Sequence, residues 1–336
     1  MKTDAFSDVV SPDAVSVPDD EHFYMTYARS RPNELVPWIE EHDVPLLTNA
    51  IHRYSEAKER HLDMWEYDTR HVIDAGGYNV MASWVTTGGG LVNGKTQQDV
   101  AEELSESTPF YPWTIQQYHE WLCEHRGEFV WATVMDYACE ERFDELWSYE
   151  DRMKATLDTT IRQYDLLDDA GRPYKLLPVL QGRDVDEYVG FYERLEEQGI
   201  PTDHVGLGTV CRMSSEKRIV RFEEKIRQRT GVNRFHGFGV KIDAFKHGAS
   251  FESADSQAWV YGPSNGWMVL DEGDSLRSVD MPDDPLTRTV ASFKNYYSYV
   301  TRLMHDESAV DYRYGLGVLT DTELREAVQR SSGVLV

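Results

Sequence analysis

Four polar side chains that can bind, attack or exchange protons stand at the ends of predicted buried strands. They are Asp74 in "HVIDAGG", Asp136 in "EFVWATVMD", Gln181 in "KLLPVLQG" and Asp255 in "SFESADS". Two carboxylates can divide a displacement reaction between a nucleophile and a proton carrier. Because the four residues are far apart in the sequence, only a fold that gathers strand ends at one edge would bring them together.

Eight short apolar runs alternate with segments of helical periodicity, which predicts the strands that carry these side chains. The runs span 22–28, 44–50, 71–77, 128–136, 175–182, 203–210, 234–241 and 250–256. Between them, 185–198 places Tyr188, Val189 and Leu195 on one helical face, and Gly199 follows where the helix would end. Eight strands alternating with helices predict an α/β fold, the (β/α)8 TIM barrel, whose active site forms at the carboxyl ends of the strands.

We expect the barrel domain to occupy residues 21–310. A short acidic N-terminal tail over 1–20 precedes it, and a C-terminal helical extension over 311–336 follows it. The segment 82–113 is longer than an ordinary βα loop and is interpreted as a lid or a substrate-contacting insertion. Glycines recur at the predicted strand ends and would keep the barrel mouth open to a ligand. They are Gly76, Gly77, Gly182, Gly206, Gly208, Gly237 and Gly239.

The charge of the chain is strongly negative, with 59 acidic against 34 basic residues and a net charge of −25. Such a charge argues against a polyanionic partner at ordinary ionic strength. At molar salt, where the Debye length is about 3 Å, this repulsion is screened, and acidic surfaces are typical of proteins adapted to high salt. A nucleic-acid partner therefore stays open under the hypothesis of a halophilic cell or its virus.

The composition also bears on the compartment. No run approaches the roughly 18 apolar residues of a membrane span, and 1–20 lacks the basic and apolar parts of a secretion signal. We therefore expect a cytoplasmic protein without a membrane partner. Cys123, Cys139 and Cys211 lack metal-ligand spacing and are expected to be free thiols.

Several motifs, taken in order, are similar to one enzyme family. "DAGGYNVM" (74–81) resembles the "DSGGYQVM" signature of the tRNA-guanine transglycosylases, and "MDYACEE" (135–141), "VLQG" (179–182), "VGLG" (205–208) and "HGFGVK" (236–241) resemble later segments of that family. The offshoot that acts on DNA, the 7-deazaguanine DNA transglycosylases (DpdA-like), is closer still, because "LPVLQGRDVDEY", "VGLGTVCR" and "SADSQAW" resemble it in order and spacing. The resemblance covers about residues 22–260.

The resemblance implies a role for each matching residue. Asp255 would be the nucleophile that holds a covalent glycosyl intermediate, and Asp74 the general acid/base. Asp136 would accept from the N1–H and 2-amino groups of a guanine-like base, and Gln181 would contact its O6 side. Gly206 and Gly208 would meet the 7-substituent. The remaining substrate-binding positions are Tyr78, His236 and Gly239; Tyr78 is either a stacking or a core residue, and His236 either lies against the base or is simply hydrogen-bonded.

Partners and cofactors follow from the same comparison. The tRNA enzymes carry a C-terminal zinc site with a Cys-x-Cys-x-x-Cys cluster, whereas no cysteine follows Cys211 here. This difference favours the DNA branch and implies neither a zinc module nor any other cofactor. The helix expected over 215–231 carries a basic stripe of Arg218, Arg221, Lys225 and Arg229. The stripe is either a contact to the nucleic-acid backbone or a solvated helix face.

We therefore expect a pentosyltransferase that exchanges guanine in DNA for free 7-cyano-7-deazaguanine or its aminomethyl relative. Three alternatives stay open. The same chemistry on tRNA is one, and a TIM-barrel glycoside hydrolase that uses Asp74 and Asp255 on a carbohydrate is another. The third is a non-catalytic base-binding subunit of a larger modification system with partner proteins.

Overall fold

The computed structural model describes nine ranges of the chain. They are residues 22–27, 35–51, 69–86, 110–111, 113–213, 215–240, 242–271, 275–280 and 285–304. The predicted tail over 1–20, most of the 82–113 insertion and the extension over 311–336 lie outside the described residues.

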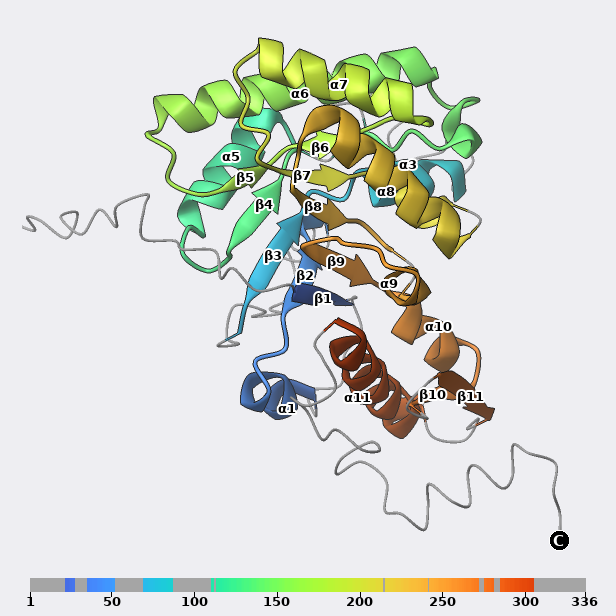
Figure 1. Cartoon of the computed structure of the whole chain (residues 1–336). Coiled ribbons are helices and arrows are strands. Elements are labelled where there is room, and N and C mark those ends of the chain that lie inside the picture. The colour runs from blue at the N-terminus through green and yellow to red at the C-terminus, as the bar shows by residue number, and fades with distance from the viewer. Residues whose placement is uncertain are drawn as a thin grey trace, which may run out of the picture.

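A parallel β-sheet forms the centre of the molecule (Figure 1). Its strand segments are β1 (His22–Tyr27), β2 (Leu46–Asn49), β3 (His71–Asp74), β4 (Trp131–Thr133), β5 (Leu176–Leu177), β6 (Val179–Leu180), β7 (His204–Leu207), β8 (Arg234–Gly237) and β9 (Ser253–Ser256). Hydrogen-bonded neighbours follow the order β5-β4-β3-β2-β1-β9-β8-β7-β6, and every pair is parallel. The two end segments, β5 and β6, are consecutive in the chain. The sheet therefore returns on itself as a nearly closed, TIM-like barrel, which confirms the expected α/β barrel architecture.

Pro178 alone separates β5 from β6. Before it, the Leu177 carbonyl accepts from the Val134 N–H at 3.1 Å, which joins this segment to the end of β4. Proline has no N–H to donate, but the Pro178 carbonyl accepts from the Gly206 N–H at 2.8 Å, which joins the segment to β7. One predicted strand thus pairs with both of its neighbours in turn.

Side chains from successive strands fill the barrel. Tyr24, Leu47, Val72, Trp131 and Leu177, one from each of β1 to β5, pack into a cluster separate from the main core. The Trp131 ring also contacts Tyr24 and His236, with ring centroids 5.8 and 4.9 Å apart. Because a filled barrel is a core and not a pore, a ligand site must form at the strand ends.

Helices follow the strands and cover the outside. They are α1 (Val36–Glu41), α3 (Gly77–Thr86), α5 (Ile115–Glu124), α6 (Tyr149–Asp169), α7 (Val185–Glu197), α8 (Glu216–Thr230), α9 (Asp243–Lys246), α10 (Ala258–Ser264) and α11 (Pro285–Met304). In α7 the predicted apolar face is confirmed, since Tyr188 and Leu195 are buried. Asp184 and Glu187 form a capping box at its start, and Gly199 follows its end with a φ of +71°. Among the helices of the described ranges, none is long and apolar enough to cross a membrane.

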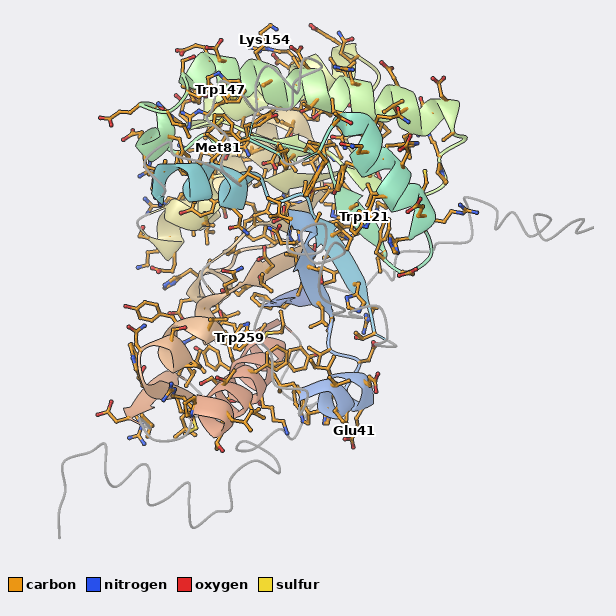
Figure 2. The ribbon with its side chains drawn as sticks, turned by 180° about the vertical axis from the view of Figure 1, so that it is seen from behind. Glu41, Met81, Trp121, Trp147, Lys154 and Trp259 are labelled. Atoms are coloured by element: carbon orange, nitrogen blue, oxygen red, sulfur yellow. The ribbon has the colours of Figure 1, made fainter. Side chains whose placement is uncertain are left out.

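The chain after β9 forms a layer that the apolar pattern did not predict. Helix α10 leads into an antiparallel hairpin of β10 (Trp267–Asp271) and β11 (Leu276–Asp280), and α11 packs on β10 and touches β1. Figure 1 shows α11 and α10 on the side of the barrel opposite to α6 and α7. Trp259, labelled in Figure 2, contacts Phe293 edge-on at 4.9 Å and donates its indole N–H to the Thr26 carbonyl at 3.1 Å. This layer is therefore bonded directly to strand β1.

Candidate active site

Three of the predicted carboxylates meet at the carboxyl end of the barrel. Asp74 is the last residue of β3, Asp255 is the penultimate residue of β9, and Asp136 follows the end of β4 by three residues. The pKa of Asp74 is raised first by burial and then by the charges of Asp136 and Asp255. Asp136 and Asp255 therefore both lie within electrostatic reach of Asp74.

Both oxygens of Asp74 have a hydrogen-bond donor. The Gly76 N–H donates to Oδ1 at 3.0 Å, and Asn49 Nδ2 donates to Oδ2 at 3.1 Å. Gly76 has a φ of +91°, and a Cβ there would lie 2.4 Å from Asn49 Oδ1, so this turn requires glycine. Burial and the neighbouring acids raise the pKa of Asp74 to about 7. Both its protonated and its ionised forms are thus available near neutral pH, which suits proton transfer.

Asp255 is buried with fixed partners on both oxygens. Thr26 Oγ1 donates to Oδ2 at 2.6 Å, and the Gly239 N–H donates to Oδ1 at 2.9 Å. His236 Nε2 lies 3.5 Å from Oδ1. Gly239 has a φ of +59°, and a Cβ there would lie 2.8 Å from the Cβ of Cys211. These contacts orient the carboxylate, as attack on a single carbon atom requires.

Asp136 and Gln181 form a buried pair beside these acids. Gln181 Nε2 donates to Asp136 Oδ2 at 2.7 Å. Two glycines lie against the pair, since a Cβ on Gly77 would lie 2.6 Å from Asp136 Oδ1 and one on Gly208 would lie 2.3 Å from Gln181 Nε2. Burial raises the pKa of Asp136 to about 6, although the Gln181 hydrogen bond opposes the shift. A carboxylate beside an amide offers acceptors and an N–H donor to the edge of a planar ligand.

Tyr78 directly follows Gly77, the glycine that lies against Asp136. The Tyr78 ring is half-buried and meets Phe143 edge-on, with centroids 5.7 Å apart. Its hydroxyl accepts a hydrogen bond from exposed Arg142 at 2.8 Å. The structure thus places an aromatic ring and a cation together at the residue that follows Gly77.

Other predicted contacts are already used within the protein. The N–H groups of Gly206 and Gly208 donate to the carbonyls of Pro178 and Leu180, at 2.8 and 3.0 Å. His236 is fully buried, its Nδ1 lies 2.8 Å from Ser253 Oγ, and its ring touches Phe238. Of the two interpretations of His236, this structure fits the hydrogen-bonded one.

The basic stripe lies on the outer face of α8. Arg218, Arg221, Lys225 and Arg229 are all exposed. On the opposite side Ile219, Phe222 and Ile226 are buried, as the helical spacing predicts. Arg229 also forms an ion pair with Asp186 of α7. The stripe is solvated here and is separate from the acids at the strand ends.

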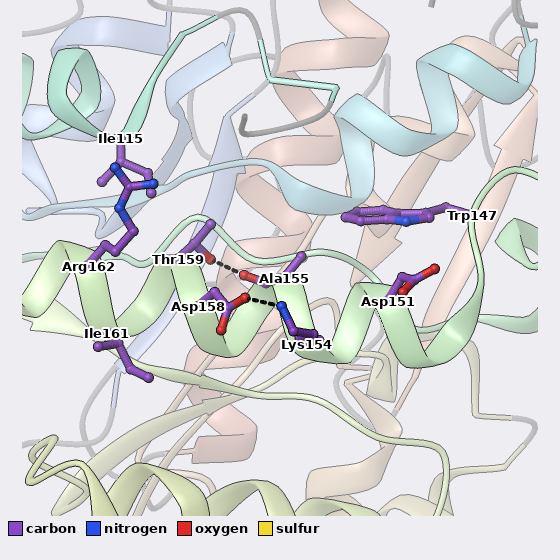
Figure 3. Close-up of a pocket in the computed structure, with 9 residues that line it drawn as sticks. All are labelled: Ile115, Trp147, Asp151, Lys154, Ala155, Asp158, Thr159, Ile161 and Arg162. Atoms are coloured by element: carbon purple, nitrogen blue, oxygen red, sulfur yellow. Dashed lines mark hydrogen bonds and ion pairs between the residues drawn. The ribbon is translucent and has the colours of Figure 1, made fainter. Parts of the chain in front are cut away.

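A cavity of about 490 Å³ lies outside the barrel against α5 and α6. Figure 3 shows Trp147, Arg162 and the Lys154–Asp158 ion pair along it. None of the predicted site residues lines this cavity. In the part of the chain that the structure describes, no group of three or more His, Cys, Asp or Glu side chains could hold a metal ion. The three cysteines are free thiols, as predicted.

Four side chains contact the predicted site residues although the sequence analysis gives them no role. They are Thr26, Asn49, Arg142 and Thr209. Thr26 and Asn49 are polar residues at the carboxyl ends of β1 and β2, so the pattern that selected Asp74 could also have found them. Thr209 Oγ1 donates to Gln181 Oε1 at 2.8 Å from a 3-10 turn that the sequence pattern does not predict.

Comparisons with known proteins give one family match. A family model described as DeoxyPurine in DNA protein A (DpdA) matches residues 38–267. No curated protein matches the chain. Among solved structures, Rhizobium etli pyruvate carboxylase crystallised without acetyl coenzyme A is similar at 11% identity and a TM-score of 0.40, over 95% of this chain and 32% of that one. This chain thus spans about a third of the length of that enzyme.

Proposed function

The chain belongs to the DpdA family (DeoxyPurine in DNA protein A), and from this membership and the site we propose that it exchanges guanine in DNA for a 7-deazaguanine base. Membership links the chain to the modification of DNA with 7-deazapurines. The proposal of base exchange rests mainly on one observation, that Asp74, Asp136 and Asp255 lie together at one end of the barrel. Base exchange needs a nucleophile, a proton carrier and a base reader, and three carboxylates in different surroundings can supply them.

We assign base recognition to Asp136 and Gln181. The Asp136 carboxylate accepts from N1–H and the 2-amino group of guanine, and the second amide hydrogen of Gln181 Nε2 faces O6. Adenine has no proton on N1 and carries an amino group at position 6, so it would leave buried polar groups unpaired. A base must leave the stack to reach this site, and the half-buried Tyr78 ring offers it a stacking surface.

The exchange takes two displacement steps. In the first, an oxygen of Asp255 attacks C1′ of the deoxyribose, the C1′–N9 bond breaks, and Asp74 donates its proton to N9 of the departing guanine. In the second, the entering base gives its N9 proton to Asp74, its N9 attacks C1′, and the ester bond to Asp255 breaks. The proton on Asp74 and the charge on Asp255 are restored. A pKa of about 7 supports both proton transfers of Asp74.

Two groups of cations are available to DNA phosphates. Arg142 is exposed beside Tyr78, and we assign it to a phosphate next to the flipped nucleotide. The α8 stripe is farther out on the barrel and would meet the duplex at a distance from the target. Because the net charge is −25, we expect these contacts to gain in importance as salt screens the remaining repulsion.

The test is incorporation of radiolabelled base by the purified protein. Guanine, 7-cyano-7-deazaguanine and its aminomethyl relative are each offered with duplex DNA and with unmodified tRNA, at low and at molar salt. We expect label in DNA, strongest at molar salt, and none with the matched variant Asp255→Asn. Label in tRNA alone would assign the chemistry to tRNA. Label in neither nucleic acid would contradict the proposal.

A further inference from the structure

Thr209 adopts a backbone conformation that is unfavourable for threonine. Its φ is +62° and its ψ is −7°, in the left-handed region. A β-branched residue is strained there, whereas glycine adopts it freely. Strain of this kind clusters at functional sites, and Thr209 directly follows Gly208, which lies against Gln181.

The Thr209 hydroxyl joins Cys139 to Gln181. Oγ1 accepts from the Cys139 N–H at 3.3 Å and donates to Gln181 Oε1 at 2.8 Å. At the other side of the same amide, Gln181 Nε2 donates to Asp136 Oδ2 at 2.7 Å. Rotating the amide by half a turn would place Oε1 against the Asp136 carboxylate. The carboxylate of Asp136, which only accepts, excludes the rotated orientation, and the Thr209 hydroxyl fixes the remaining one by donating to Oε1 while it accepts from the Cys139 N–H.

The amide also has little room to move. Gly208 lies so close that a Cβ there would be 2.3 Å from Gln181 Nε2. The Gly208 carbonyl accepts from the Tyr188 hydroxyl, and its N–H donates to the Leu180 carbonyl at 3.0 Å. The peptide that supports Gln181 is thus fixed on both sides, and Gln181 itself is only 1% exposed.

We propose that Thr209 is a positioning residue that holds the Gln181 amide with its NH2 group toward the bound base. In this orientation the site pairs with a purine that has an oxygen at position 6 and opposes one that has an amino group there. The inference rests on the proposed function, because it takes Asp136 and Gln181 as the pair that reads the base.

The test is calorimetric binding of two free bases, guanine and 2,6-diaminopurine, which share the 2-amino group. Three variants separate the hydroxyl from the backbone. Thr209→Val keeps the branched shape and removes the hydroxyl, Thr209→Ser keeps the hydroxyl, and Thr209→Gly removes both hydroxyl and strain. We expect the native protein and Thr209→Ser to prefer guanine equally. We expect the preference to fall about tenfold in Thr209→Val and Thr209→Gly, the effect of one lost hydrogen bond.

Thr209→Gly separates positioning from folding. Because glycine suits a positive φ, its melting temperature should equal or exceed the native one while its preference for guanine falls. Thr230→Val, which removes a hydroxyl that bonds the Ile226 carbonyl at 2.8 Å in α8, should leave the preference unchanged. An unchanged preference in Thr209→Val and Thr209→Gly would overturn the inference. So would a preference lost equally in Thr209→Ser, or a native protein that binds neither base.

Failure of the proposed function would look different. A native protein that binds guanine selectively, loses selectivity with Thr209→Val and yet puts no label into DNA would refute base exchange and leave the role of Thr209 standing. A protein that labels DNA while Thr209→Val keeps the native preference would refute the role of Thr209 alone.

Discussion

The two ends of the barrel hold their charged groups in opposite ways. At the amino end, Arg234, the first residue of β8, and Glu252, just before β9, form an ion pair, with Nε and Oε1 2.7 Å apart. Nearby, Lys175 Nζ lies 3.3 Å from His204 Nδ1. Burial and then the neighbouring cations lower the pKa of His204 far below its ordinary value, so the imidazole is neutral. Charge at this end is paired or removed.

At the carboxyl end, acids stand next to acids. Burial raises the pKa of both Asp74 and Asp136, and neighbouring carboxylates raise each further. The N–H groups that donate to these two carboxylates belong to Gly76, Asn49 and Gln181 and carry no charge. Such an arrangement costs stability in the free protein and is completed only by a ligand that brings donors. The difference is the one expected if the amino end contributes to stability and the carboxyl end carries out the proposed base exchange.

Removing the proposed nucleophile, Asp255, should have the largest effect. Asp255→Asn should lower base exchange by on the order of 10⁴-fold, because an amide cannot form the glycosyl ester. Binding of free guanine should stay within a few-fold of native, since Asp136 and Gln181 are untouched. Single-turnover exchange and calorimetry measure the two quantities.

Glu252→Gln is the matched control from the amino end, three residues earlier in the chain. It weakens the pair with Arg234, so the melting temperature should fall, but exchange per folded molecule should be unchanged. Loss of exchange in Glu252→Gln with native exchange in Asp255→Asn would reverse the assignment of the two ends.

Asp136→Asn should have the next largest effect. The amide presents N–H where the carboxylate accepted, and hydrogen bonds to a charged group are worth about 1.5–3 kcal/mol, so affinity for guanine should fall about 100-fold. Titration of the folded variant with free guanine checks this. Native affinity for guanine in Asp136→Asn would remove the base-reading role and favour the carbohydrate alternative.

A methyl group on Gly77 should have a smaller effect. Its Cβ would lie 2.3 Å from the Asp136 carbonyl and 2.6 Å from Oδ1, so the carboxylate must shift. We expect Gly77→Ala to lower guanine affinity about tenfold, the value of a weakened hydrogen bond. Gly190→Ala in α7, which has open space around the same position, should instead stabilise the protein by about 0.5–1 kcal/mol. Equal behaviour of the two variants would show that α3 does not hold Asp136 in place.

The strands could be predicted because the apolar runs are continuous, but their ends could not. The run over 128–136 is reduced to Trp131–Thr133, since the chain leaves the sheet there to place Asp136 in the mouth. The run over 175–182 is divided at Pro178. The hairpin β10–β11 and helix α11 lie beyond residue 260, where the resemblance ends. The hairpin packs on α11, and α11 packs against β1, which no local pattern reports.

The site could be predicted where its chemistry is conspicuous. An acid after a buried run, such as Asp74, stands out, because a carboxylate at that position needs an explanation. Thr26 and Asn49 occupy equivalent positions, yet threonine and asparagine are ordinary residues at strand ends and turns. Thr209 depends on a positive φ that tertiary contacts impose. Sequence therefore indicates the proposed reacting groups better than the groups that orient them.

The smallest predicted effect is on the pH dependence of stability. Asp74 at the carboxyl end of the barrel and His204 at its amino end change the stability in opposite directions as the pH rises. The pKa of Asp74 is about 7 in the folded protein against an ordinary value of 3.8. Between pH 3.8 and pH 7 the folded state therefore binds more protons than the unfolded state, so the free energy of unfolding falls as the pH rises. For His204, whose pKa is lowered from 6.5, the unfolded state binds more protons, so stability falls as pH drops below about 6.5.

Urea titrations of two variants across pH should separate the effect of Asp74 on stability from that of His204. The free energy of unfolding of the native protein should fall between pH 5 and pH 8. In Asp74→Asn this fall should be smaller by about 1–2 kcal/mol, because solvent and the neighbouring charges screen the partly exposed Asp74 carboxylate. His204→Gln should leave the fall in stability that Asp74 causes at rising pH unchanged, and it should reduce the loss of stability below pH 6. The change of the unfolding free energy with pH is the informative quantity, because Asp74→Asn also disturbs the Asn49 hydrogen bond, and so lowers stability, at every pH. Asp74→Asn could instead show the native dependence of the unfolding free energy on pH. The acids at the carboxyl end would then be better solvated than their burial indicates. Like the charged groups at the amino end, they would not destabilise the folded protein.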